Sequence, residues 1–269
     1  MEDKINNQLG SVLFIPHGGG PLPLLGDEAH NGMIEFLETI ALVLKPTAVL
    51  LISAHWEETN ATITSSLNQS LIYDYYGFPE EAYEIQYPVH GSPALAHRVH
   101  ELLKMKGIES TLDSQRGFDH GVFVPLKIMF PDASVPCVQL SLINSLSPQE
   151  HINIGKALSE LKKDKILIIG SGFTFHNLKA IFSSSTESID IKNEAFEKWL
   201  VDTCTNENIF EQDREIRLNN WESAPYARYC HPREEHLMPL HVCYGIAGSA
   251  AKLVFNEKIF GKKTSAFLW

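Results

Sequence analysis

The chain has 269 residues, of which 44% are hydrophobic and 20% charged, and it carries a formal net charge of −11 at pH 7. This acidic balance, with no stripe of lysine or arginine, argues against binding to nucleic acid, whose phosphate backbone requires a concentrated basic surface. No apolar run approaches the roughly 18 residues that a membrane-spanning helix needs, so we expect no membrane partner.

In the first part of the chain, strand-like segments alternate with a helix-like one. Residues 11–16 form a continuous apolar run typical of a strand that is buried on both faces. Residues 32–45 show a helical period of apolar side chains, and Pro46 ends that segment. Residues 48–53 predict a second buried strand, and residues 61–65 alternate as in a strand near a sheet edge.

The same alternation continues along the rest of the chain. The remaining predicted segments, in chain order, are an aromatic loop over 73–79, a helix over 92–106 capped by Ser92, a strand over 135–142, a helix over 148–162 capped by Ser147, a strand over 165–170, and a mainly helical part from about 187 with a short strand near 252–255. This order predicts one α/β domain over residues 1–269, with a central mostly parallel or mixed sheet flanked by helices.

The cellular compartment follows from the cysteines and the N-terminus. The four cysteines are dispersed without a Cys-x-x-Cys pair, so they indicate neither a disulfide framework nor a zinc ribbon. The first residues are acidic and lack the apolar core of a signal peptide. We therefore expect a cytoplasmic protein.

Three of the predicted strands lead into a histidine. His17 directly follows the first strand, His55 lies just beyond the second, and His176 comes after a short turn that follows residues 165–170. Because the carboxyl ends of neighbouring parallel strands form the ligand crevice of an open α/β sheet, we expect these imidazoles to meet there. Neutral imidazoles suit both Zn(II) and Fe(II), so the sequence predicts a metal site at this edge without choosing the metal.

A fourth candidate ligand lies near the end of the chain. His236 opens an apolar helix-like run, which lets its imidazole face the sheet. Glu234 or Glu235 could instead supply a carboxylate and complete the facial triad of non-haem iron enzymes. Their alternative role is that of acidic residues at a helix N-terminus, where the macrodipole favours them.

An Asp-His pair stands between two glycines in an otherwise apolar stretch, residues 117–126. The pattern indicates a turn that either presents His120 to a pocket or uses Asp119 to cap the following helix. Other histidines lie in polar or helical settings and are expected at the surface: His30, His90, His97, His100 and His151.

Six segments together resemble the class III extradiol ring-cleavage dioxygenases, in particular their DOPA 4,5-dioxygenase-like group. They occur in the family's order, from the first strand to the last helix, and span nearly the whole chain. The matching segments are Pro16-His17-Gly18-Gly19-Gly20-Pro21, Ser53-Ala54-His55-Trp56, Tyr87-Pro88-Val89-His90-Gly91-Ser92-Pro93, Gly117-Phe118-Asp119-His120-Gly121, His176-Asn177-Leu178 and Glu235-His236-Leu237-Met238-Pro239-Leu240.

The resemblance implies a division of roles among the histidines. His17, His55 and His236 would be the metal ligands, with His236 standing where the protocatechuate branch uses a glutamate. His176 would be the catalytic acid and base, and a candidate fourth ligand. His120 would be a second catalytic histidine that contacts substrate or oxygen.

The resemblance also implies the reaction and its partners. A DOPA-like aromatic diol and O2 would give a semialdehyde of a muconic acid. Fe(II) would be the cofactor for activity, and Zn(II) would be able to bind the same ligands in its place. The residues Trp56, Phe118 and Phe173, together with Phe175, are candidates for the wall that holds the ring. The stretch before His176 is bulkier than in many relatives, which predicts a different pocket shape.

Two other functions remain open from the residues alone. A zinc-dependent hydrolase would use three histidines and one open metal position to activate water. A non-catalytic metal-binding protein would instead close the site with His17, His55, His176 and His236.

Overall fold

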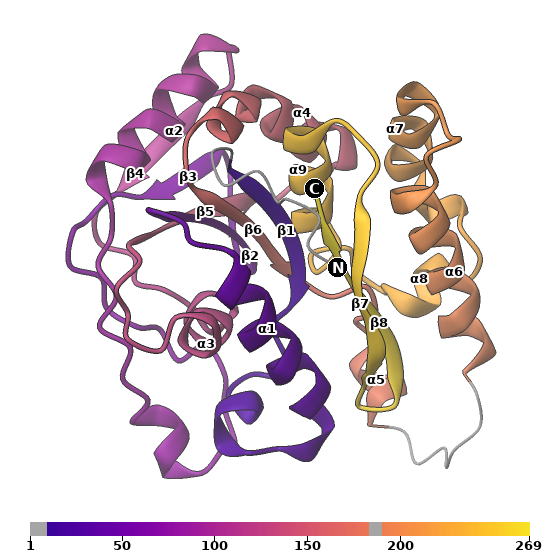
Figure 1. The fold of residues 1–269 in the computed structure, drawn as a ribbon, viewed down its shortest axis with the longest axis horizontal. Coiled ribbons are helices and arrows are strands. Elements are labelled where there is room, and N and C mark those ends of the chain that lie inside the picture. The colour runs from indigo at the N-terminus through magenta and orange to yellow at the C-terminus, as the bar shows by residue number, and fades with distance from the viewer. Residues whose placement is uncertain (1–9, 183–189) are drawn as a thin grey trace.

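One eight-stranded sheet forms the centre of the molecule in the computed structural model, which describes residues 10–182 and 190–269 (Figure 1). Its strands are β1 (Ser11–Pro16), β2 (Val49–Glu58), β3 (Ala61–Thr64), β4 (Ser110–Asp113), β5 (Cys137–Ile143), β6 (Leu167–Gly172), β7 (Lys252–Ile259) and β8 (Lys262–Leu268). Their order across the sheet is β4-β3-β5-β2-β6-β1-β8-β7.

The sheet is mixed. The four central strands β5, β2, β6 and β1 are parallel to one another. On one side, β3 pairs antiparallel with β5 and carries β4 in parallel, while on the other side β8 and β7 pair antiparallel. The predicted α/β class with a mostly parallel or mixed sheet is therefore confirmed.

Helices cover both faces of this sheet, as the predicted alternation requires (Figure 1). α1 and α3 pack together on one face, and α4 and α9 pack together on the other, with α2 beside α4. The helices are α1 (Asn31–Val43), α2 (Pro93–Met105), α3 (His120–Met129), α4 (Pro148–Ala157), α5 (Leu178–Ile181), α6 (Ile191–Thr205), α7 (Glu211–Asn219), α8 (Ala227–Cys230) and α9 (Met238–Ala247). None of the helices in the described ranges is long and apolar enough to cross a bilayer.

The central strands are apolar throughout because both of their faces are buried. In β1, Val12 and Phe14 belong to the core on the α4 and α9 face, whereas Leu13 and Ile15 belong to the core on the α1 and α3 face. Successive side chains of a strand point to opposite faces, so each residue contributes to one of the two cores. The continuous apolar runs of the sequence follow from this arrangement.

The predicted helix starts are confirmed at two serines. The Ser92 hydroxyl accepts a hydrogen bond from the Leu95 amide, and Ser147 accepts one from the Glu150 amide. The helix predicted over 148–162 is shorter, because α4 ends at Ala157 and a separate 3-10 turn, Ser159–Lys163, follows it.

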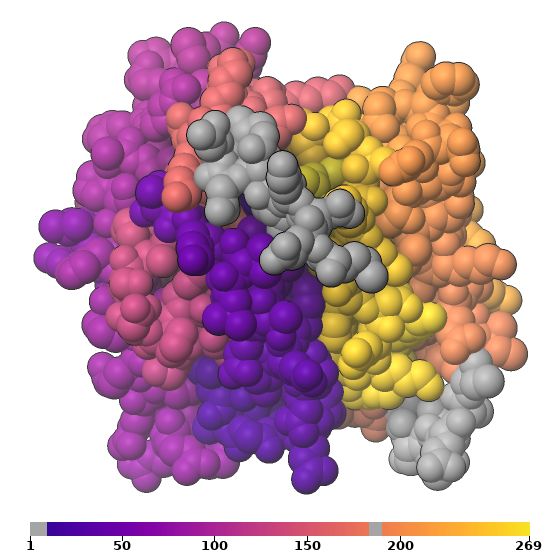
Figure 2. Space-filling view, viewed as in Figure 1, coloured from indigo at the N-terminus to yellow at the C-terminus, as the bar shows by residue number. Residues whose placement is uncertain are grey.

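The end of the chain differs from the prediction of one short strand near residues 252–255. β7 and β8 form a hairpin, and β8 pairs antiparallel with β1, which adds two strands to the sheet. In the space-filling view this hairpin, in yellow, lies between the indigo N-terminal part and the orange helices (Figure 2). The sequence does not predict β8, because its first residues, Lys262 and Lys263, interrupt the apolar pattern.

Glu197 is a buried acid in α6 whose state should make stability depend on pH. Ser265 donates a 2.7 Å hydrogen bond to its Oε2, while its Oε1 has no hydrogen-bond partner in the described part of the chain. Burial raises the pKa of Glu197 from its ordinary 4.5 to about 7. Because the folded state holds this proton more tightly than the unfolded chain, its contribution to stability falls as pH rises from 4.5 to 7.

We therefore expect Glu197→Gln to remove part of the pH dependence of unfolding. Relative to this variant, the wild type should lose on the order of 3 kcal/mol of unfolding free energy between pH 4.5 and 7, and little more above pH 7. Urea denaturation at several pH values measures this difference. Glu194→Gln, on the same helix, is the matched control, and parallel pH profiles for wild type and Glu197→Gln would contradict the prediction.

Candidate metal centre and active site

Five histidines converge on one cavity of about 390 Å³, at the edge of the sheet where β1 and β6 end. The cavity brings together all the histidines for which the sequence predicts a role. They are His17, His55, His120, His176 and His236.

His17 directly follows β1 and is 1% exposed. The chain turns sharply after it, because Gly18 adopts φ +85°, a conformation that favours glycine. Its Nδ1 lies 3.0 Å from the Ser171 hydroxyl, which itself donates to the carbonyl of Gly121. Ser171 therefore accepts a hydrogen bond from His17 Nδ1, and the His17 Nε2 lone pair is left for the cavity.

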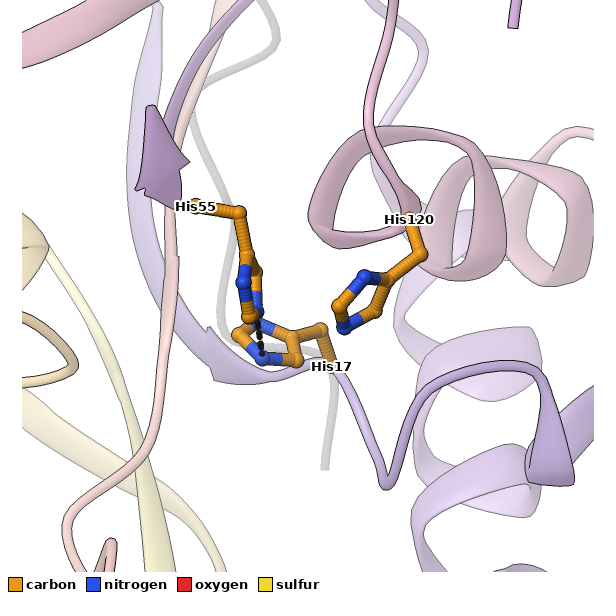
Figure 3. Close-up of side chains that lie close together, drawn as sticks. All are labelled: His17, His55 and His120. Atoms are coloured by element: carbon orange, nitrogen blue, oxygen red, sulfur yellow. Dashed lines mark hydrogen bonds between the residues drawn. The ribbon is translucent and has the colours of Figure 1, made fainter. Parts of the chain in front are cut away.

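His55 lies within β2 rather than beyond its end. The pairing of β2 with β6 stops at Ser53, and the register of β2 against β5 shifts between Ile52 and Glu57. This irregularity frees the His55 ring to face His17, with 3.1 Å between their Nε2 atoms. Figure 3 shows both rings and that of His120 turned toward one another.

His120 is the first residue of α3. Its Nδ1 donates to Asp74 Oδ1 at 2.8 Å, and its backbone amide donates to the same oxygen at 2.9 Å. Asp74 Oδ2 also lies 3.6 Å from Nδ1 of His55, so one carboxylate from the aromatic loop faces two histidines. The free nitrogen of His120 is again Nε2.

The predicted cap of this helix is corrected by the structure. Asp119 occupies the N-cap position but its side chain makes no capping bond. Its carboxylate instead accepts hydrogen bonds from Ser53 at 2.7 Å and from the Gln139 amide. The capping oxygen comes from Asp74, which is 46 residues away in sequence.

His176 and His236 lie side by side because the chain beyond β6 runs along the segment before α9. Phe173 donates its amide to the carbonyl of His236 at 3.0 Å. A Cβ on Gly172 would lie 2.2 Å from that carbonyl, so only glycine allows this approach. The two imidazoles stack with their centroids 3.4 Å apart and 20° between their planes.

Glu235 holds both of these rings. Its Oε1 lies 3.0 Å from Nδ1 of His176 and 2.9 Å from Nδ1 of His236. The sequence offered Glu234 and Glu235 as alternatives to a histidine ligand or as helix charges. The structure places Glu235 behind the histidines, where it orients them, and Glu234 in an ion pair with Arg228.

The electrostatics of the cavity favour the neutral forms of His17, His55 and His236 and the ionised form of Glu235. Burial lowers the pKa of His17 and His55 well below the usual value, and neighbouring histidines add to the effect. Burial and the adjacent His176 lower the pKa of His236 to about 3. Burial opposes ionisation of Glu235, but the hydrogen bonds from His176 and His236 outweigh it and hold its pKa far below 4.5.

This donor set fits a divalent metal. The carboxylate of Asp74 favours the proton of His55 on Nδ1, so the Nε2 lone pairs of His55 and His17 point at each other across 3.1 Å. A cation is the partner that two such lone pairs require. The ring of His236 is close enough to join them, with centroid distances of 5.3 Å to His17 and 5.0 Å to His55.

Two sets of ligand atoms meet within 4.8 Å among the described residues. One consists of His17, His55 and His120, and the other of His176, Glu235 and His236. The predicted set of His17, His55 and His236 draws on both. The cavity is thus a single histidine-rich centre. His17 belongs to one set and His236 to the other, and their ring centroids are 5.3 Å apart.

The aromatic wall differs in part from the prediction. Phe173 and Phe175 line the cavity, together with aromatic side chains from the loop before α2 and from the β7–β8 turn: Tyr75, Tyr76, Phe78 and Phe260. Trp56 and Phe118, which were predicted to line it, do not. Trp56 follows His55 in β2 and therefore points to the opposite face, where its indole donates to Glu58 and Arg116 lies over its ring.

Phe118 is completely buried in the core on the α1 and α3 face. It precedes the Asp119-His120 turn, and its backbone pairs with the loop at Ser70 and Ile72. The residue therefore holds the turn in place without reaching the cavity.

Two histidines predicted at the surface are buried. His30 accepts a hydrogen bond from the Gly19 amide at 3.0 Å and donates to Asp27, so it fixes the glycine turn after His17. His151 bonds the Ser147 carbonyl at the start of α4.

The chain matches the family described as the catalytic LigB subunit of aromatic ring-opening dioxygenase over residues 12–266. It belongs to this family. This LigB-family protein is therefore an extradiol-type, non-haem dioxygenase, an oxidoreductase that acts on an aromatic substrate with O2. The family decides against the zinc-dependent hydrolase and the non-catalytic metal-binding protein.

The names of curated relatives agree with the family assignment, because they too are dioxygenases. It is 36% identical to dioxygenase tasH of Hapsidospora irregularis, with 97% of this chain and 86% of the relative covered. It is also 36% identical to a 4,5-DOPA dioxygenase extradiol of Beta vulgaris, with 95% and 93% covered. A crystal structure of an uncharacterized protein, JW3007, from Escherichia coli K12 superposes with a TM-score of 0.78 at 28% identity, covering 96% of this chain and 99% of that one.

The bridge made by Asp74 gives a testable expectation. Asp74→Asn should weaken the binding of a divalent cation by about 10- to 100-fold, because the amide no longer fixes His55 and His120 in the tautomers that expose Nε2. Titration of metal-free protein with Zn(II) against a chromophoric chelator measures the affinity. Asp132→Asn is the control, because this exposed carboxylate lies away from the cavity lining and bonds Ser134 in its own turn. An affinity of Asp74→Asn within twofold of the wild type would show that the bridge does not matter.

Proposed function

We propose that this dioxygenase opens a catechol-type aromatic diol next to its two hydroxyl groups and forms a muconic semialdehyde, with residues 1–269 acting as one catalytic domain. Both atoms of O2 enter the product, and one ring carbon–carbon bond is broken. The observation that carries the proposal is the meeting of the Nε2 atoms of His17 and His55 beside His236, in an aromatic cavity of a LigB-family chain.

His17, His55 and His236 are proposed to hold the metal. Each has its Nδ1 directed at a supporting oxygen, on Ser171, Asp74 and Glu235 respectively, and this leaves Nε2 as the ligand atom. Fe(II) is proposed as the working ion. It would supply the Lewis acidity that lowers the pKa of the catechol hydroxyls and the redox chemistry that O2 requires.

His176 is proposed as the acid and base. Its ring stacks on His236, so a diol held near His236 lies within reach of His176 Nε2. Glu235 accepts from His176 Nδ1 at 3.0 Å and would stabilise the imidazolium that forms when the ring takes a phenolic proton. The same proton can return to the product oxygen as the ring opens.

His120 is proposed as the second catalytic histidine. Asp74 fixes its ring with Nε2 toward the cavity, and the centroids of His120 and His55 are 3.9 Å apart. From this position His120 can donate to or accept from substrate or oxygen beside the metal ligands. Phe173, edge-on to His17 at 5.4 Å, would exclude water from the same space.

The test is a comparison of metals and of oxygen. Metal-free protein is loaded anaerobically with Fe(II) or with Zn(II), a catechol is added, and O2 is then admitted. Oxygen uptake and a yellow semialdehyde are expected only with Fe(II), although Zn(II) is expected to bind more tightly. Equal product with Zn(II) in the absence of O2 would reject ring cleavage.

Two alanine variants separate the proposed roles. His17→Ala should lose most bound metal and reduce turnover at least about 1000-fold, because one of three ligands is removed. His176→Ala should retain its metal but reduce kcat by about 100- to 10,000-fold, the usual contribution of a proton-transferring side chain.

Metal analysis and oxygen uptake on the same preparations measure both effects. His97→Ala, an exposed histidine of α2, serves as the control and should match the wild type. Full metal content and turnover in His17→Ala would refute the ligand assignment, and unchanged kcat in His176→Ala would refute the acid–base role.

A further inference from the structure

The chemistry of the cavity wall points to a class of substrate, an inference that rests on the proposed function. We propose that the cavity selects catechols whose ring substituent is uncharged and apolar. It discriminates against catechols that carry an ionised side chain, such as DOPA itself.

The part of the cavity lining that the structure describes offers no lysine or arginine to a carboxylate. Residues 183–189, which follow the lining residue Phe182 in sequence, read Ser-Ser-Ser-Thr-Glu-Ser-Ile and contain no basic residue either. A buried carboxylate without a cation or a set of donors loses its hydration without compensation, so the cavity disfavours an anionic substituent.

Among the described residues of the lining, no acidic side chain is free to pair with an ammonium group either. Asp74 is the acidic side chain of the lining, and its Oδ1 already accepts two hydrogen bonds from His120 while its Oδ2 faces His55. The hydroxyl of Tyr75 donates to the carbonyl of Ala82 at 2.5 Å. The Asp74 carboxylate and the Tyr75 hydroxyl thus serve the protein itself.

The nearest basic groups are matched by acids or lie in solvent. Lys262 lies 5.6 Å from the ring centre of Phe175, outside the lining, and pairs with Asp190 at 2.6 Å. A neighbouring groove shares His176 with the cavity and contains Lys179 and Arg233. Arg233 forms a bidentate ion pair with Glu57, with N···O distances of 2.6 and 2.5 Å.

Lys179 in the same groove is exposed, so water screens its charge. Neither basic residue of the groove therefore offers a buried, unpaired charge to a substrate. An anionic substituent that turned toward the groove would gain little in exchange for its hydration.

The mouth of the cavity is apolar. Tyr76, Phe182 and Leu178 line it while being 92%, 74% and 54% exposed, whereas His17 at the inner end is 1% exposed. Exposed apolar side chains grouped at a pocket mouth mark contact with an apolar ligand. With the diol at the histidines, the substituent of the ring extends toward these three side chains.

The preference is tested with three catechols of similar size at the 4-position: 4-propylcatechol, 3-(3,4-dihydroxyphenyl)propionate and DOPA. Oxygen uptake by the Fe(II)-loaded protein gives kcat/KM, and anaerobic calorimetry with Zn(II)-loaded protein gives the binding affinity. We expect both quantities to be at least tenfold higher for 4-propylcatechol than for either charged catechol. Equal values, or higher values for DOPA or the propionate, overturn the proposal.

A rim variant tests where the substituent lies. Phe182→Lys should improve kcat/KM for the propionate relative to 4-propylcatechol by at least fivefold, with unchanged metal content. Leu42→Lys, at a 77% exposed position of α1 outside the cavity lining, is the matched control and should leave the ratio unchanged. A ratio that changes less than twofold in Phe182→Lys contradicts the proposed contact.

The two readouts distinguish this proposal from the proposed function. If no catechol is opened but 4-propylcatechol still binds tenfold more tightly, ring cleavage is wrong and the preference stands. If all three are opened and bound alike, ring cleavage stands and the preference is wrong.

Discussion

The site depends on hydrogen bonds that lie behind the histidines rather than on contacts within the cavity. Ser171, Asp74 and Glu235 each face the Nδ1 of one or two imidazoles, so that the Nε2 atoms of all five rings are left toward the cavity. Four of these contacts are hydrogen bonds, and the fifth, between Asp74 and His55, is a longer ion-pair contact of 3.6 Å. Burial keeps His17, His55 and His236 neutral, so their lone pairs stay available. Because the supporting oxygens come from strand β6, the aromatic loop and the segment before α9, the fold must be complete before the centre exists.

The open edge of the parallel strands explains how these segments meet. β1 and β6 end beside each other, which places His17 next to Ser171. Beyond β6 the chain runs along the segment before α9, and the absence of a side chain at Gly172 allows the backbone of His236 to approach. Short-range rules place each histidine at an edge, and tertiary packing sets the distances between them.

The parts of the molecule that sequence reasoning predicted are those set by local pattern. The apolar runs before His17 and His176, the serine caps of α2 and α4 and the α/β class all follow from periodicity and capping chemistry. Asp74 was missed because nothing near it indicates that it caps a helix 46 residues away. Trp56 is adjacent to His55 in the sequence, and it was therefore predicted to line the same cavity. This prediction was wrong because neighbouring residues in a strand point to opposite faces of the sheet.

The double role of Asp74 ties the wall of the cavity to its centre. This residue precedes Tyr75 and Tyr76 in the aromatic loop while it holds His120 and the start of α3. A change of loop shape that admits a new ring substituent would therefore also displace a carboxylate on which two imidazoles depend. Phe182 lies on a different segment, and its hydrocarbon side chain has no group that could hydrogen-bond the histidines. Evolution of new substrate ranges in this fold should thus proceed fastest at the Phe182 rim and slowest in the loop around Asp74.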